Sequence, residues 1–171
     1  YGIRSGSMLT ISDNAAITNA TGGSGRSGGN GIFGSVMKII SSTIGTAQGG
    51  EGKTSGGNGI YGVGKLTISD GAVITNATGG NATSIDGTGG SGIFSDGELT
   101  IKSAAIGTAK GGNADNGTGG SGIRGDGSSD DFKLSIDSAN ITNATGGSGK
   151  SGGSGLFGKT LKIISSAIRA I

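Results

Sequence analysis

Hydrophobic positions along this chain form a pattern of five anchors that occurs six times. Each unit opens on Gly-Ile or Gly-Leu, continues with two hydrophobic residues spaced two apart, and closes on an isoleucine that small residues follow. The units begin at Gly2, Gly31, Gly59, Gly92, Gly122 and Gly155. Unit length varies while the anchors persist, which is the signature of a repeat architecture.

The anchors fall into five columns when the units are superimposed. The first column is Ile3, Ile32, Ile60, Ile93, Ile123 and Leu156, and the second is Leu9, Met37, Leu66, Leu99, Leu134 and Leu161. The third is Ile11, Ile39, Ile68, Ile101, Ile136 and Ile163, and the fourth is Ile17, Ile44, Ile74, Ile106, Ile141 and Ile168. The fifth is Ala20, Ala47, Ala77, Ala109 and Ala144, with Ile171 in the last unit. We expect these columns to point into a common core.

The anchor spacing predicts strands. The second and third anchors are always two residues apart, as in Leu99-Thr100-Ile101, and β-branched residues at period two are typical of strands. Helix is disfavoured because an interior glycine costs about 1 kcal/mol relative to alanine. Short strands bury an apolar face only when successive coils stack, about 4.8 Å apart.

Residues 1–171 are therefore predicted to form one all-β domain, a single-stranded parallel β-helix, or β-solenoid. It has about six coils of 28–33 residues, each with three short strands. The rod would be about 29 Å long at the usual layer spacing.

Glycine-rich segments separate the units, and 42 of the 171 residues are glycine. We expect these segments, such as residues 21–31, at one corner of the coil, where glycine readily adopts a positive φ. A flexible loop is the other interpretation for the longest two, residues 78–92 and 110–122. After the fourth anchor, units alternate between Ile-Thr-Asn-Ala and Ile-Gly-Thr-Ala, so the full repeat is a pair of coils.

This alternation creates a polar column two residues after the fourth anchor. It contains Asn19, Thr46, Asn76, Thr108 and Asn143. We expect the column at a corner, where its side chains satisfy the backbone groups of turns.

The composition excludes several kinds of chemistry. The chain has no cysteine or histidine, so the usual zinc and haem sites, disulfides and catalysis by imidazole or thiol are ruled out. We expect no cofactor and no enzymatic activity. The net charge of +2 is spread without a basic block, and apolar runs fall far short of the roughly 20 residues of a membrane span. Neither nucleic acid nor membrane insertion is expected.

Two stretches carry a resemblance to a known class of proteins. The phrases "GGNGIYGVGKLTISDGAVITNATGG" and "GGSGIFSDGELTI" resemble repeats of bacterial cell-surface β-helix proteins, including autotransporter passengers and polymorphic-membrane-protein repeats. They also look like glycine-rich repeats of gut bacterial surface proteins. The resemblance covers all six units and implies a right-handed parallel β-helix and an extracellular location. The long glycine segments and the two-coil alternation depart from that class.

One outward column is a candidate binding surface, which we call the lateral stripe. It follows the first anchor and contains Arg4, Phe33, Tyr61, Phe94, Arg124 and Phe157. Because the preceding residue faces inward, strand alternation points the lateral stripe outward. Aromatic and guanidinium groups could bind a sugar or a second rod. The other interpretation is a satellite core covered by the glycine segments.

Carboxylates near the stripe are a weaker candidate. Asp96 and Asp126 occupy equivalent places in adjacent units, with Asp130 and Asp131 in an insertion just beyond. Stacked carboxylates could hold a calcium ion or serve in glycoside hydrolysis, although a solvated charge cluster is simpler. Asn81 lies in an Asn-Ala-Thr sequon within a glycine segment and is the weak candidate for glycosylation.

Neither end of the chain shows a polar cap, which a solenoid normally needs. We therefore expect a structural or adhesive extracellular rod that stacks head to tail with copies of itself, or a slice of a longer rod. A carbohydrate-binding β-helix is the first alternative, and a carbohydrate-cleaving one is less favoured. An ice-binding face is the last alternative, because lysines interrupt the outward row of Thr10, Lys38, Thr67, Thr100, Ser135 and Lys162.

Overall fold

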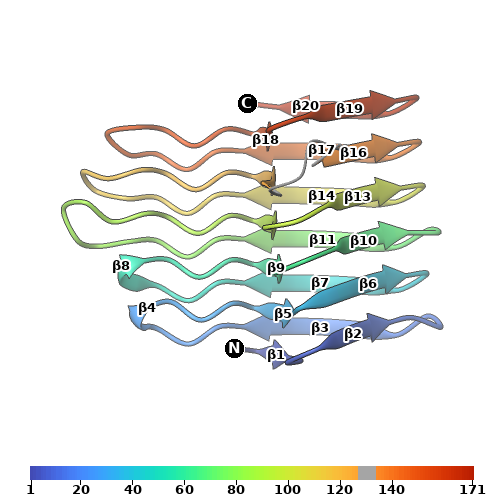
Figure 1. Ribbon diagram of the computed structural model, residues 1–171, viewed down its shortest axis with the longest axis horizontal. Coiled ribbons are helices and arrows are strands. Elements are labelled where there is room, and N and C mark those ends of the chain that lie inside the picture. The colour runs from blue at the N-terminus through green and yellow to red at the C-terminus, as the bar shows by residue number, and fades with distance from the viewer. Residues whose placement is uncertain (127–133) are drawn as a thin grey trace.

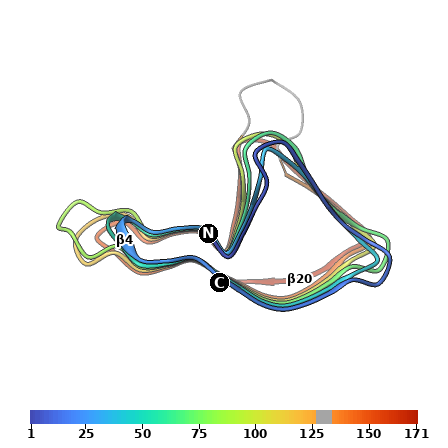
Figure 2. The same cartoon turned by 90° about the horizontal axis from the view of Figure 1, so that it is seen from below.

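The chain forms an all-β solenoid, as the anchor pattern predicts. The computed structural model describes residues 1–126 and 134–171. Within them, three parallel sheets of six strands each run along the rod, and each coil adds one strand to every sheet (Figure 1). Seen from the N-terminal end in Figure 2, the chain turns clockwise as it recedes, so the coil is right-handed.

The strands are short and follow one another in the same order in every coil. The first sheet contains β1 (Ile3–Arg4), β5 (Ile32–Gly34), β9 (Ile60–Gly62), β12 (Ile93–Ser95), β15 (Ile123–Gly125) and β18 (Leu156–Gly158). The second contains β2 (Met8–Ile11), β6 (Val36–Ile40), β10 (Leu66–Ser69), β13 (Leu99–Lys102), β16 (Leu134–Asp137) and β19 (Leu161–Ile164). The third contains β3 (Ala16–Thr21), β7 (Thr43–Gln48), β11 (Val73–Thr78), β14 (Ala105–Lys110), β17 (Asn140–Thr145) and β20 (Ala167–Ala170).

The three sheets enclose a triangular body whose interior is the hydrophobic core (Figure 2). Side chains of the inner coils, such as Ile60, Leu99 and Ile101, are fully buried there. Cα pairing places like on like, with Leu66 opposite Leu99 and Ile68 opposite Ile101. The predicted columns are therefore stacked rungs, and few residues per coil fill the narrow core.

In the last coil, one predicted anchor is wrong. Ala170 pairs with Ala144, whereas Ile171 was expected there. The register shifts between Ile141 and Ala144 because the last unit has a single residue, Arg169, where earlier units have two. Ile171 continues the strand edge, and its N–H donates to the carbonyl oxygen of Ala144.

The glycine-rich segments extend from one corner of the body as a long flat arm (Figure 2). Each segment runs outward and returns, so the arm has an outgoing wall and a returning wall. At the tip of the first two layers, β4 (Gly25–Ser27) pairs with β8 (Gly52–Ser55). Backbone hydrogen bonds link both the walls and successive layers: Gly57 N–H donates to Gly50 O, and Gly80 N–H donates to Gly57 O.

Close backbone approach, and not a positive φ, explains the glycines of the arm. Among the described glycines only Gly71 has a positive φ, so the expectation of left-handed glycines is wrong. A Cβ built on Gly49 would lie 1.9 Å from the carbonyl oxygen of Gly57 in the opposite wall. A Cβ on Gly80 would lie 2.0 Å from the carbonyl oxygen of Gly50 in the layer below. Side chains are excluded from the arm interior because backbone fills it.

Left-handed residues occur instead at the corner between the second and third sheets. They are Asp13, Asn14, Ser41, Asp70, Ser103, Ser138 and Ser165, with Gly71 beside Asp70. Asp and Asn tolerate this conformation better than most residues, since their short polar side chains bond locally.

The polar column also differs from its predicted role. Asn76 pairs with Thr46 and Thr108 as expected, but within the strands of the third sheet and not at a corner. Other asparagines satisfy the backbone between layers. Asn58 N–H donates to Asn30 Oδ1 over 2.7 Å, and Ser91 N–H donates to Asn58 Oδ1 over the same distance.

Candidate functional site

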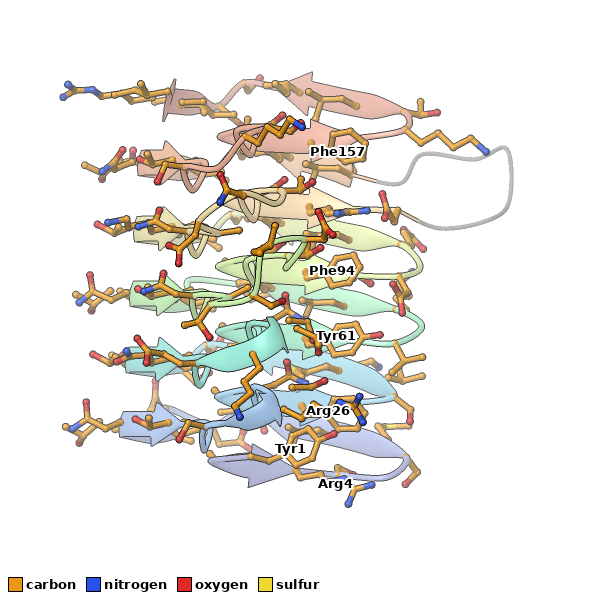
Figure 3. The ribbon with its side chains drawn as sticks, turned by 90° about the vertical axis from the view of Figure 1, so that its left-hand side faces the viewer. Tyr1, Arg4, Arg26, Tyr61, Phe94 and Phe157 are labelled. Carbon is orange, nitrogen blue, oxygen red and sulfur yellow. The ribbon has the colours of Figure 1, made fainter. Side chains whose placement is uncertain are left out.

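The lateral stripe lies on the outer face of the first sheet. Its residues pair in register from strand to strand, with Phe33 opposite Tyr61 and Tyr61 opposite Phe94. Figure 3 shows Tyr61, Phe94 and Phe157 one above another along the rod. Phe33, Tyr61, Phe94 and Arg124 are half-buried, whereas Arg4 and Phe157 at the two ends are exposed.

Neighbouring stripe residues contact one another through their flat faces or ring edges. Tyr61 and Phe94 stack with ring centroids 5.1 Å apart, and Phe33 meets Tyr61 edge-on at 5.5 Å. The Arg124 guanidinium lies between two rings, 5.2 Å from the centroid of Phe94 and 5.2 Å from that of Phe157. Cation-π contacts of this kind contribute about 0.5–1 kcal/mol at exposed sites.

Tyr1 joins the lateral stripe, although it lies outside the column of residues that follow the first anchor. Its ring centroid lies 5.2 Å from that of Phe33, and the Arg4 guanidinium lies 5.1 Å from the Tyr1 ring. Tyr1 comes before the glycine that opens the first coil, at the place that Asn30 occupies in the second. The signal in the sequence for this role is an aromatic residue at a position where the other coils have Asn or Ser.

Two carboxylates serve the stripe as hydrogen-bond partners. The Tyr61 hydroxyl donates to Asp96, and Arg124 donates to Asp126, with 2.9 Å between Nε and Oδ2. Burial, and then the hydrogen bond to Asp96, raise the pKa of Tyr61 well above its usual value. The phenol therefore stays protonated and keeps donating to the carboxylate.

This pairing bears on the carboxylate candidates. Asp96 and Asp126 occupy equivalent places, since their N–H groups donate to Gly62 O and Ser95 O, each one coil earlier. Each carboxylate already has a donor in its own part of the stripe. Asp130 and Asp131 lie outside the described residues. In the described ranges, no three acidic side chains gather as a metal site would require.

The ring geometry limits how the stripe could bind a ligand. The stacked rings of Tyr61 and Phe94 turn faces toward each other, and the Arg124 guanidinium lies over the Phe94 and Phe157 rings, so these ring faces are already in contact within the stripe. At the two ends of the stripe, Phe157 is 41% exposed, and Tyr1 is 55% exposed with the Arg4 guanidinium over its ring. A ligand alongside these residues could therefore not stack between Tyr61 and Phe94 without separating the two rings.

Asn81 lies exposed in the outgoing wall of the arm. Its Oδ1 accepts a hydrogen bond from the N–H of Asn113 in the next layer, over 2.8 Å, and Asn113 repeats this contact with Ser148. The side chain thus helps to align arm layers, and its glycosylation stays a prediction.

Comparisons with protein-family models, with curated proteins and with solved structures found no match for this chain. The described part of the chain contains no helix that is long and apolar enough to cross a membrane.

Proposed function

We propose that the protein is a structural or adhesive extracellular module: a stiff rod that stacks head to tail with copies of itself and displays the lateral stripe along one side. The resemblance to bacterial cell-surface β-helix repeats supports the location and the class. The absence of catalytic imidazole and thiol groups from the sequence agrees with a role that needs shape and not chemistry.

The carrying observation is that the second and third core columns continue in register into the last coil. Ile163 occupies the same column as Ile101, yet Ile163 is 48% exposed whereas Ile101 is fully buried. Likewise Leu161 is 42% exposed and its equivalent Leu99 is fully buried. These side chains face the interior, and no layer of the described residues lies above them; a first coil of the same kind would cover them.

The open strand edges offer the matching polar contacts. β19 and β2 end the second sheet, and each has a strand partner on one side only. Unpaired edges are templates for pairing with another chain. A stack of copies would continue both the hydrogen bonds and the apolar rungs, and a heterologous contact of this kind produces filaments.

A substitution on the open rung tests the stacking. In Ile163→Lys the charged group would enter the interface between copies, so sedimentation and electron microscopy should show shorter rods than in the wild type. Thr67→Lys is the matched control, because it adds the same charge to an outward column that already contains Lys38. Wild-type protein that stays monomeric at all concentrations, or rods equally long in Ile163→Lys, would refute self-stacking.

Carbohydrate binding by the lateral stripe is the second candidate. The observation in its favour is that Asp96 bonds to Tyr61 and Asp126 bonds to Arg124 within the stripe, since sugars bind through hydrogen bonds together with contact to aromatic groups. Titration with polysaccharides should give binding that Asp96→Asn and Phe94→Ala both weaken. Affinity unaffected by either change would exclude the stripe as the sugar site.

A further inference from the structure

Among the Gly-Gly pairs of the arm, two glycines are not required by the contacts of the arm itself. A Cβ built on Gly23, in the lowest layer, would meet no atom within 4 Å. A Cβ built on Gly152, in the highest layer, would approach only Gly147 O, at 3.9 Å, which is ordinary contact. Neither residue has a positive φ. An alanine would fit at both places in the chain as it stands.

The same positions in the inner layers leave no room for a side chain. Equivalents of Gly23 meet the carbonyl oxygen of the layer below, at 2.2 Å for Gly50 and 2.0 Å for Gly112. Equivalents of Gly152 meet the carbonyl oxygen of the layer above, at 1.8 Å for Gly56 and 2.1 Å for Gly119. Glycine at positions 23 and 152 is therefore the residue that a layer needs when another layer covers its outer side.

Backbone hydrogen bonding gives a second, independent indication. The N–H of Gly50 donates to Gly29 O of the layer below, and every higher layer repeats this bond. The N–H of Gly119 donates to Ser151 O of the layer above. The corresponding N–H groups of Gly23 and Gly152 have no backbone acceptor among the described residues. Each end of the arm therefore presents donors placed for one more layer.

A head-to-tail copy does not supply that layer. Each sheet of the body has six strands, whereas the sequence has five glycine segments between them. When the first coil of one copy lies on the last coil of another, the bodies touch but one arm layer is missing between them. The gap at the arm is one layer spacing, about 4.8 Å.

We infer that both ends of the arm are docking faces for a further glycine arm: an extended polypeptide segment with a Gly-Gly pair on its outgoing limb and another on its returning limb. The partner is defined by steric chemistry, because any side chain at the paired positions would strike backbone oxygen, as in the inner layers. The contact continues the interface between successive arms within the chain. It is independent of self-stacking through the body.

A copied arm tests the inference. Residues 49–59, appended after Ile171 of the full chain, place a complete arm directly above Gly152. The Gly152 N–H should then exchange with solvent at least about tenfold more slowly than in the unextended chain, since a hydrogen-bonded amide exchanges only on local opening. The matched control appends the same residues with alanine in place of the four paired glycines, and should give no protection.

A second variant separates docking from a general effect of the extension. The appended arm should raise the melting temperature of the chain. Gly152→Ala should remove this rise in melting temperature and should leave the melting temperature of the unextended chain unchanged. Equal exchange of the Gly152 N–H with both extensions, or an undiminished rise in Gly152→Ala, would overturn the inference. Sedimentation of the unextended chain reports self-stacking separately, so failure of one proposal is distinguishable from failure of the other.

Discussion

The ring of Tyr61 stacks on the ring of Phe94 in the next coil, with centroids 5.1 Å apart and planes 5° from parallel. The two strands pair in parallel register, which brings equivalent outward side chains one above the other. Aromatic contacts of this kind contribute about 0.5–1.5 kcal/mol beyond their buried area. The lateral stripe therefore stabilises the rod whether or not it also binds a ligand.

The environment of Tyr61 predicts a loss of stability in alkali. Burial and the bond to Asp96 raise its pKa in the folded chain above the unfolded value of about 10. The stabilisation is complete below that value and is lost as the pH rises through and above it. Urea unfolding as a function of pH should show a steeper decline above about pH 10 in the wild type than in Tyr61→Phe. Parallel profiles would contradict the assignment.

A smaller effect is expected in acid at Glu98. Its hydrogen bond with Lys65, 2.9 Å between Nζ and Oε2, lowers the pKa of this carboxyl group. The stabilisation is present above the ordinary carboxyl pKa of about 4.3 and disappears as the pH falls below it. Because both side chains are half-exposed, Glu98→Gln should cost at most about 1 kcal/mol at neutral pH. The difference in unfolding free energy from the wild type should shrink as the pH falls below about 4.3, and a difference that does not change with pH would have another origin.

Two glycine-to-alanine substitutions in the arm should differ greatly in their effect on the free energy of unfolding. Gly80→Ala places a methyl group 2.0 Å from the carbonyl oxygen of Gly50, and such overpacking costs about 1–3 kcal/mol or more. Gly23→Ala meets nothing and should be neutral or stabilising by up to about 1 kcal/mol through the unfolded state. Denaturant unfolding of both variants measures the contrast. Equal losses would mean that successive layers of the arm are not packed backbone to backbone.

Replacing Asn58 should measure how much one hydrogen bond between layers near the body contributes to the free energy of unfolding. Asn58→Ala removes the oxygen that accepts from the N–H of Ser91, and Ser91 is only 4% exposed. A buried donor without a partner costs about 1–3 kcal/mol. Asn113→Ala is the control, because it removes the same type of bond, to Ser148 N–H, at an exposed place where water can replace it. Equal losses in unfolding free energy would contradict the role of burial.

Much of the fold could be predicted because each coil repeats the same local pattern. Alternation around Leu99-Thr100-Ile101 determines which side chains face inward, and identical anchors in successive units determine what lies above them. The outward direction of the lateral stripe follows from the same alternation. The last coil escaped prediction because the loss of one residue leaves two alignments, and only the pairing of Ala170 with Ala144 decides between them.

The sequence by itself determined the coil number, the core columns and the outward stripe, since these depend on periodicity along the chain. Only the tertiary structure decided why the arm consists of glycine. Gly49 and Gly57 belong to opposite walls, and their closeness depends on how the segment folds back and how layers stack. Local reasoning considers φ at one residue, whereas the constraint here is the space between two backbones. The contacts among Tyr61, Asp96, Phe94 and Arg124 likewise arise from stacking between coils.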